Sequence, residues 1–276
     1  MKLGVFIALK HDGQTIDEKF AAVRNYGLDY CQLTCWDFDF YTDEVAAEVV
    51  AACKKYGITI STFWAGWSGP KVWDFEEGPV TLGIVPPAYR YQRMQELMAG
   101  SDFAKKIGVN QVATHVGFIP ENPSDPNFMP VVSAVKAVAE HCKENGQYFL
   151  FETGQETPVA LARVIERTGL DNIGINMDVA NLILYGKANP IDALDTLGKY
   201  VRDMHAKDGN YPTDSKSLGE EKKVGEGKVN FPALIAKLKS IGYDGHMTIE
   251  REISGDQQVR DIIDTKAYLE SLINGI

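Results

Sequence analysis

The chain has 276 residues, of which 45% are hydrophobic and 24% are charged, with 28 lysines and arginines against 38 aspartates and glutamates. This composition is ordinary for a globular protein, and no apolar run approaches the roughly 18 residues that a membrane-spanning helix needs. The net charge of −10, without any cluster of basic residues, argues against DNA or another polyanion as the partner. We therefore expect neither a membrane segment nor a nucleic-acid partner.

Short apolar or β-branched runs alternate with longer amphipathic segments along the chain. The first run, residues 3–8, is followed at once by polar residues without a cleavage-type sequence, which predicts a strand in a cytoplasmic protein rather than a signal peptide. Eight strands are predicted at residues 3–8, 30–34, 58–63, 109–115, 148–152, 173–178, 201–205 and 245–249. Eight helices are predicted at residues 17–26, 43–56, 90–107, 131–144, 157–167, 191–197, 231–241 and 259–273. Glycines follow most of these helices, as is common at helix C-termini.

The strand–helix alternation runs through the whole chain without a break in composition that would mark a linker. Eight βα units in this length predict a single (β/α)₈ TIM-barrel domain over residues 1–276. An open, doubly wound sheet would begin with a glycine-rich phosphate turn after the first strand, and residues 8–13 contain no such turn. The barrel is therefore the predicted architecture.

Four successive strands, the fifth to the eighth, end in a potential metal ligand: Glu152, Asp178, His205 and Glu250. A single acidic residue after a strand is usually a helix N-cap or a solvated charge. In a barrel, however, all strands end at the same rim, so these four side chains would converge. Three carboxylates and an imidazole suit Mn²⁺ best, with Mg²⁺, Co²⁺ or Zn²⁺ as alternatives. A cation would also relieve the repulsion among the carboxylates.

Other residues at this rim have two interpretations each. His115, at the end of the fourth strand, is either a satisfied core histidine or a hydrogen-bond donor to a substrate, and its place on the rim favours the substrate. Trp36 and Trp64 are packing residues or a wall for sugar stacking, and two further tryptophans lie in the loop after the third strand. The polar loop at residues 206–230 either covers the site, meets a second subunit of a homo-oligomer, or is simply solvated.

These residues resemble the xylose isomerase-like TIM-barrel superfamily, in the group known as sugar phosphate isomerases/epimerases, over essentially the whole chain. The most specific matches are Phe151-Glu152-Thr153, Met177-Asp178-Val-Ala-Asn181, His205-Ala-Lys207-Asp208, Gly225-Glu226-Gly227, Phe231, Gly242-Tyr243-Asp244-Gly245 and Ile249-Glu250. The resemblance implies that Glu152, Asp178, His205 and Glu250 bind a divalent metal ion. It also implies that the two glutamates are the catalytic acid/base pair.

The implied function is a metal-dependent isomerase or epimerase of a ketose or keto-sugar, working by proton transfer through a metal-stabilised enediolate. Elimination of a β-hydroxyl from the same enediolate would make the protein a dehydratase similar to inosose dehydratase. An endonuclease IV-like nuclease would need more histidine ligands than this sequence provides. A non-catalytic sugar-binding barrel is the remaining alternative, and the intact ligand set argues against it.

Two positions depart from the ketose 3-epimerase pattern. Asn181 replaces a substrate-binding histidine, and Tyr211 replaces an arginine. Lys207 is expected to supply the cationic contact instead, and Lys207, Asn181 and His115 are expected to orient substrate hydroxyls. The sequence shows no phosphate cradle, which favours an unphosphorylated small-molecule sugar.

Overall fold

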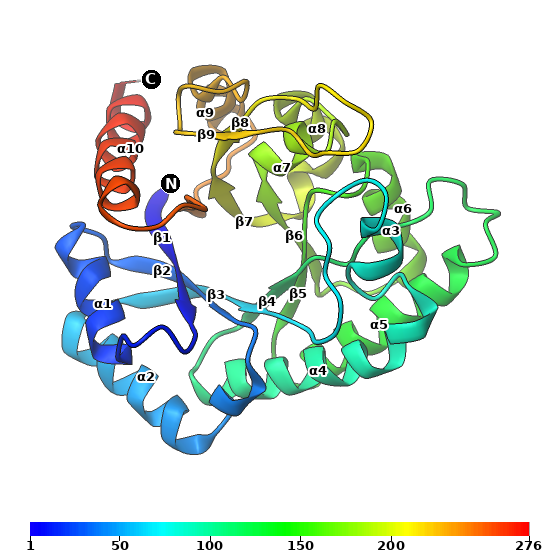
Figure 1. The fold of residues 1–276 in the computed structure, drawn as a ribbon, viewed down its shortest axis with the longest axis horizontal. Coiled ribbons are helices and arrows are strands. Elements are labelled where there is room, and N and C mark those ends of the chain that lie inside the picture. The colour runs from blue at the N-terminus through cyan, green and yellow to red at the C-terminus, as the bar shows by residue number, and fades with distance from the viewer. Residues whose placement is uncertain (276) are drawn as a thin grey trace.

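Eight parallel strands close into a barrel in the computed structural model, which describes residues 1–275 (Figure 1). The strands of the barrel are β1 (Lys2–Leu9), β2 (Tyr30–Cys35), β3 (Thr59–Ala65), β4 (Gln111–Thr114), β5 (Tyr148–Glu152), β6 (Ile173–Asp178), β7 (Val201–Ala206) and β10 (His246–Ile249). β1 pairs in parallel with both β2 and β10, which closes the ring. The predicted (β/α)₈ TIM barrel is therefore confirmed.

Eight main helices form the outer ring, and all of them were predicted with shifts of a few residues at their ends. They are α1 (Ile16–Asn25), α2 (Asp43–Tyr56), α4 (Pro87–Lys106), α5 (Phe128–Glu144), α6 (Pro158–Thr168), α8 (Pro190–Leu197), α9 (Phe231–Ser240) and α10 (Asp256–Gly275). Local sequence sets their ends: Thr15 and Glu18 form a capping box at the start of α1, and Gly57 ends α2 in the left-handed conformation. None of the described helices is long and apolar enough to cross a membrane.

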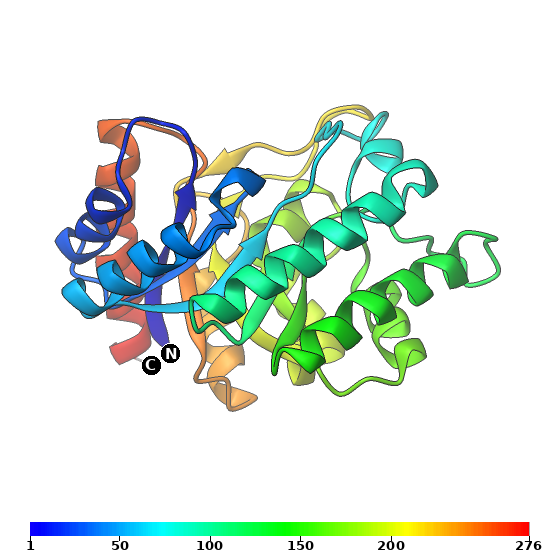
Figure 2. The same ribbon diagram turned by 90° about the horizontal axis from the view of Figure 1, so that it is seen from below.

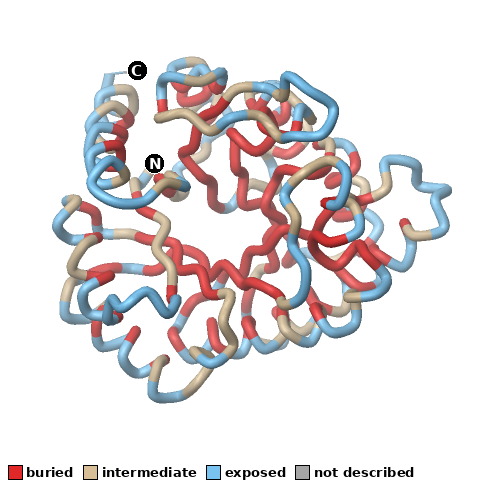
Figure 3. Tube along the Cα trace, in the orientation of Figure 1, coloured by how far each residue is buried: buried red, intermediate tan, exposed pale blue. Residues whose placement is uncertain are grey.

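The strands and the inward faces of the helices form the buried core, while the outward helix faces are exposed (Figure 3). Inside the barrel, however, several side chains are polar and bind one another across the ring. The amide of Gln32 donates to Asn176 Oδ1 at 2.9 Å, and Thr62 Oγ1 donates to Asp203 Oδ2 at 2.7 Å. Because side chains alternate along a strand, Cys31 next to Gln32 packs into the apolar core instead. This polar layer lies beneath the carboxyl-terminal rim.

The rim carries short elements that were not predicted, besides the 3-10 turn at Phe38–Phe40. Among them are α3 (Gly78–Thr81), α7 (Val179–Leu184) and the antiparallel pair β8 (Asp208–Gly209) and β9 (Glu221–Lys222). The loops after β3 and β7 lie side by side above the barrel (Figure 2), where the backbone N–H of Phe75 donates to the carbonyl of Lys216 at 3.0 Å. Together these loops cover part of the barrel mouth.

Two buried charged residues hold these rim loops. The guanidinium of Arg93 lies over the ring of Trp67 and donates to four backbone carbonyls of the loop after β3. These carbonyls belong to Ser68, Pro70, Thr81 and Gly83. The carboxylate of Asp208 accepts four backbone N–H groups at the two ends of the loop after β7. These belong to Gly209, Gly225, Gly227 and Val229. Each loop is thus anchored through its own backbone.

Candidate metal and substrate site

The structure brings together the four predicted ligands at the ends of β5, β6, β7 and just past β10. All four side chains are buried, and one ligand atom from each lies within 4.8 Å of the others. His205 Nδ1 is at the centre: it lies 3.4 Å from Glu152 Oε1, 3.6 Å from Asp178 Oδ2 and 3.2 Å from Glu250 Oε2. The barrel topology therefore produces the predicted convergence of three carboxylates and one imidazole.

Two amides below the rim orient the His205 ring. His205 Nε2 lies 2.8 Å from Gln32 Oε1, which can only accept a hydrogen bond, and 3.1 Å from the amide nitrogen of Asn176. The shorter contact favours a proton on Nε2, so Nδ1 is the ring nitrogen that faces the carboxylates and that a metal ion would use. Neither Gln32 nor Asn176 was identified from the sequence, although a polar residue in the middle of an apolar strand is the signal for both.

The two carboxylate oxygens of Asp178 have different surroundings. Its Oδ1 accepts the backbone N–H of Asn181 at 2.8 Å and so caps the N-terminus of α7. Its Oδ2 is buried, forms no hydrogen bond and faces His205 Nδ1. One carboxylate thus caps a helix with one oxygen and remains a potential ligand with the other.

The charged side chains around His205 favour the binding of a cation. Burial lowers the pKa of His205, but the charges of Glu152 and Glu250 outweigh it and hold that pKa well above its usual value. Burial likewise raises the pKa of Glu250, but Lys207 and His205 outweigh burial and bring it well below the usual value. The Lys207 ammonium, itself buried, lies 3.1 Å from Glu250 Oε2 and 3.6 Å from Asp178 Oδ2. Lys207 and a protonated His205 carry two positive charges against three buried carboxylates, so negative charge remains at this site.

The four residues fit a divalent cation. His205 Nδ1 and Asp178 Oδ2 are buried polar atoms without a hydrogen-bond partner, and such atoms are rare unless something else satisfies them. Oxygen and imidazole nitrogen donors suit Mn²⁺, Mg²⁺, Co²⁺ and Zn²⁺. A second group of potential ligands, His11, Asp37 and Asp39, is largely exposed, and no orphaned buried atom accompanies it.

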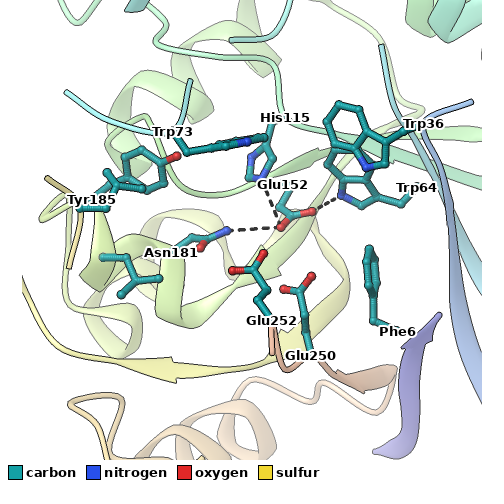
Figure 4. Close-up of a pocket in the computed structure, with 12 residues that line it drawn as sticks. Phe6, Trp36, Trp64, Trp73, His115, Glu152, Asn181, Tyr185, Glu250 and Glu252 are labelled. Carbon is teal, nitrogen blue, oxygen red and sulfur yellow. Dashed lines mark hydrogen bonds and ion pairs between the residues drawn. The ribbon is translucent and has the colours of Figure 1, made fainter. Parts of the chain in front are cut away.

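A cavity of about 290 Å³ opens above Glu152 and Glu250, just below the volume of about 300 Å³ at which the range for small-ligand sites begins. Its twelve lining residues are Phe6, Trp36, Trp64, Trp73, His115, Glu152, Asn181, Leu184, Tyr185, Leu218, Glu250 and Glu252 (Figure 4). Aromatic rings form much of its wall: the ring centroids of Trp36 and Trp64 are 5.0 Å apart. The cavity therefore combines an aromatic wall with a carboxylate floor, an arrangement that suits a small polyhydroxylated ligand.

Three side chains that were predicted to bind substrate contact Glu152 directly. Trp64 Nε1 donates to Glu152 Oε2, the Asn181 amide donates to Oε1 at 3.4 Å, and His115 Nε2 lies 3.4 Å from Oε1. His115 Nδ1 is buried and has no hydrogen-bond partner, and the residue itself lines the cavity. Trp64 lies within β3, not after it as predicted.

The structure differs from the sequence analysis in which other side chains reach the cavity. Lys207 is not among the lining residues, because its ammonium is buried beneath Glu250 and Glu252. Glu252 and Tyr185 line the cavity but were not identified as site residues. The preceding Glu250 was a signal for Glu252, since side chains two apart in an extended segment point the same way.

A closed (β/α)₈ barrel with three carboxylates and one imidazole at its rim defines a class of barrel proteins suited to divalent cations. The sequence model of the xylose isomerase-like TIM barrel family matches residues 20–272, so the chain belongs to this family. The family resemblance inferred from the sequence motifs is confirmed.

The chain is also similar to individual proteins and solved structures. An uncharacterized protein of Methanocaldococcus jannaschii is 30% identical over 174 residues, which are 59% of this chain and 56% of that protein. The chain spans about half the length of the curated relatives it matches. The crystal structure of a xylose isomerase domain protein from Planctomyces limnophilus is 32% identical and has a TM-score of 0.91, covering 100% of this chain and 97% of that chain. A D-tagatose 3-epimerase-like protein shares the fold at 20% identity and a TM-score of 0.76, covering 100% and 99% of the two chains.

Proposed function

We propose that the protein is a divalent-metal-dependent isomerase or epimerase that moves a proton next to the carbonyl group of a keto-sugar. The observation that carries this proposal is the convergence of four buried potential ligands, two of which, Glu152 and Glu250, line an aromatic-walled cavity. Glu152, Asp178, His205 and Glu250 would hold the metal ion. When bound, a divalent cation polarises a carbonyl group and stabilises negative charge on its oxygen.

The side chains of this chain supply proton transfer and substrate positioning. Glu152 and Glu250 enter the cavity from β5 and from the end of β10, which β6 and β7 separate in the barrel. In the proposal they remove and return the proton from different sides of the bound sugar. His115 and Asn181, which flank Glu152, orient substrate hydroxyls, and Trp36 and Trp64 stack against the apolar face of the sugar.

Metal binding is tested first by thermal unfolding. Metal at one hundred times its Kd adds about 2.7 kcal/mol to the free energy of unfolding. For a chain of this size that corresponds to a rise in Tm of about 5–10 °C. Mn²⁺ should produce this rise in chelator-treated protein, and Asp178→Asn should reduce it. The matched control Asp39→Asn changes the exposed second group and should leave the rise intact. An equal loss in both variants would contradict the assignment.

The reaction is tested by deuterium incorporation in D₂O, followed by NMR with ketoses, their 3-keto derivatives and inosose. Deuterium should enter next to the carbonyl group only when metal is present, and Glu152→Gln and Glu250→Gln should each abolish this exchange. The product identifies the reaction as epimerisation, isomerisation or loss of a hydroxyl. Metal-dependent stabilisation without exchange on any sugar would refute the proposed activity.

A further inference from the structure

Glu252 is a fourth carboxylate at the cavity, outside the group of four potential metal ligands. It differs from its neighbour Glu250 in exposure, since its side chain is 60% exposed whereas that of Glu250 is 9% exposed. In Figure 4 the carboxylates of Glu252 and Glu250 lie next to each other in the cavity. Glu252 is thus accessible to a ligand that lies above the metal site.

Two sets of contacts hold Glu252 in place. Its Oε2 lies 3.0 Å from the ammonium of Lys207, which also holds Glu250. Its backbone N–H donates to both carboxylate oxygens of Glu221 at 3.1 and 3.2 Å, and Glu221 is itself paired with Arg251 at 2.9 Å. Its Oε1 has no hydrogen-bond partner among residues 1–275. The side chain therefore presents one free carboxylate oxygen in a fixed position.

The charge of the cavity decides which kind of ligand can use this oxygen. Among the described residues that line the cavity there are three glutamates and no lysine or arginine. Glu152, Asp178, Glu250 and Glu252 carry four negative charges, whereas Lys207 and a divalent cation would carry three positive charges. One net negative charge remains, which repels an anionic substituent but attracts the proton of a hydroxyl group.

We infer that Glu252 is a specificity-determining residue that accepts a hydrogen bond from a hydroxyl of a neutral sugar and disfavours phosphorylated sugars. This inference rests on the proposed function, which supplies the class of ligand, a keto-sugar. The competing explanation is that Glu252 only neutralises Lys207. Lys207 already has Glu250 and Asp178 as partners, so a third carboxylate is not needed to neutralise one ammonium.

The test is ligand binding to Mg²⁺-loaded protein, measured by tryptophan fluorescence because Trp36, Trp64 and Trp73 line the cavity. The probes are D-fructose, D-tagatose and an inosose, together with phosphate esters of the two ketoses. The wild type should bind a neutral sugar more tightly than its phosphate ester. Glu252→Gln should weaken that binding by about 10- to 100-fold, since hydrogen bonds to charged groups are among the strongest. Glu252→Lys should reverse the preference in favour of the ester.

The matched control is Glu220→Gln, which removes an exposed carboxylate from the neighbouring loop and should leave every affinity unchanged. Melting curves of all variants separate a loss of folding from a loss of binding. Three results would each overturn the inference: unchanged affinity in Glu252→Gln, tighter binding of the phosphate ester by the wild type, or no binding of any neutral sugar. Glu252-dependent binding without proton exchange would instead refute only the proposed reaction.

Discussion

Glu156, in the loop between β5 and α6, provides a test of the structure that does not depend on the proposed function. Its side chain is completely buried, and neither carboxylate oxygen has a hydrogen-bond partner. Burial raises the pKa of Glu156 from 4.5 to about 8. The folded protein therefore holds this proton over a pH range in which the unfolded chain has lost it. Stability contributed by the protonated group is complete below pH 4.5 and falls as the pH rises towards 8.

The magnitude follows from the size of this pKa shift. Each pKa unit corresponds to about 1.4 kcal/mol, so the wild type should lose up to about 5 kcal/mol of stability between these limits. Glu156→Gln keeps the shape and a neutral polar group but cannot ionise. It should therefore resemble the wild type in free energy of unfolding near pH 4.5 and exceed it by several kcal/mol above pH 8.

The assay is urea unfolding of both proteins in the presence of chelator, followed by tryptophan fluorescence across this pH range. Glu144→Gln, a change of an exposed glutamate on α5, serves as the control and should show no pH-dependent difference from the wild type. The reasoning is refuted if the difference between Glu156→Gln and the wild type is the same at low and high pH.

Three further predictions concern the rim loops, and each is checked by a separate measurement. Gly83→Ala should lower the free energy of unfolding by about 3 kcal/mol or more, because the new Cβ would lie 1.9 Å from the carbonyl oxygen of Val116. Gly57→Ala, at a similar positive φ but in open space, should cost only about 1 kcal/mol in the same urea titration. Arg93→Met should destabilise the protein by about 3–5 kcal/mol in thermal unfolding, since it leaves buried carbonyls unpaired, and an unchanged Tm would contradict this. Asp208→Ala should speed hydrogen exchange within residues 206–230 but not in α5, as measured by mass spectrometry.

The sequence predicted the scaffold of the site because a barrel converts chain order into spatial position. Once eight βα units were recognised, the ends of the last four strands had to meet at one rim, and Glu152, Asp178, His205 and Glu250 followed. Short elements escaped prediction for a physical reason. All six residues of α7 (Val179–Leu184) are buried, so the segment has no amphipathic period that would reveal a helix.

By itself, the sequence determined the fold and which four side chains converge, because both depend on periodicity and on the order of strands. Only the tertiary structure decided how individual atoms are used. It showed that Asp178 caps a helix with one oxygen and faces His205 with the other, and that Gln32 turns His205 Nδ1 toward the carboxylates. It also placed Lys207 beneath the cavity and Glu252 beside it. These details depend on contacts between residues distant in sequence, which no local pattern records.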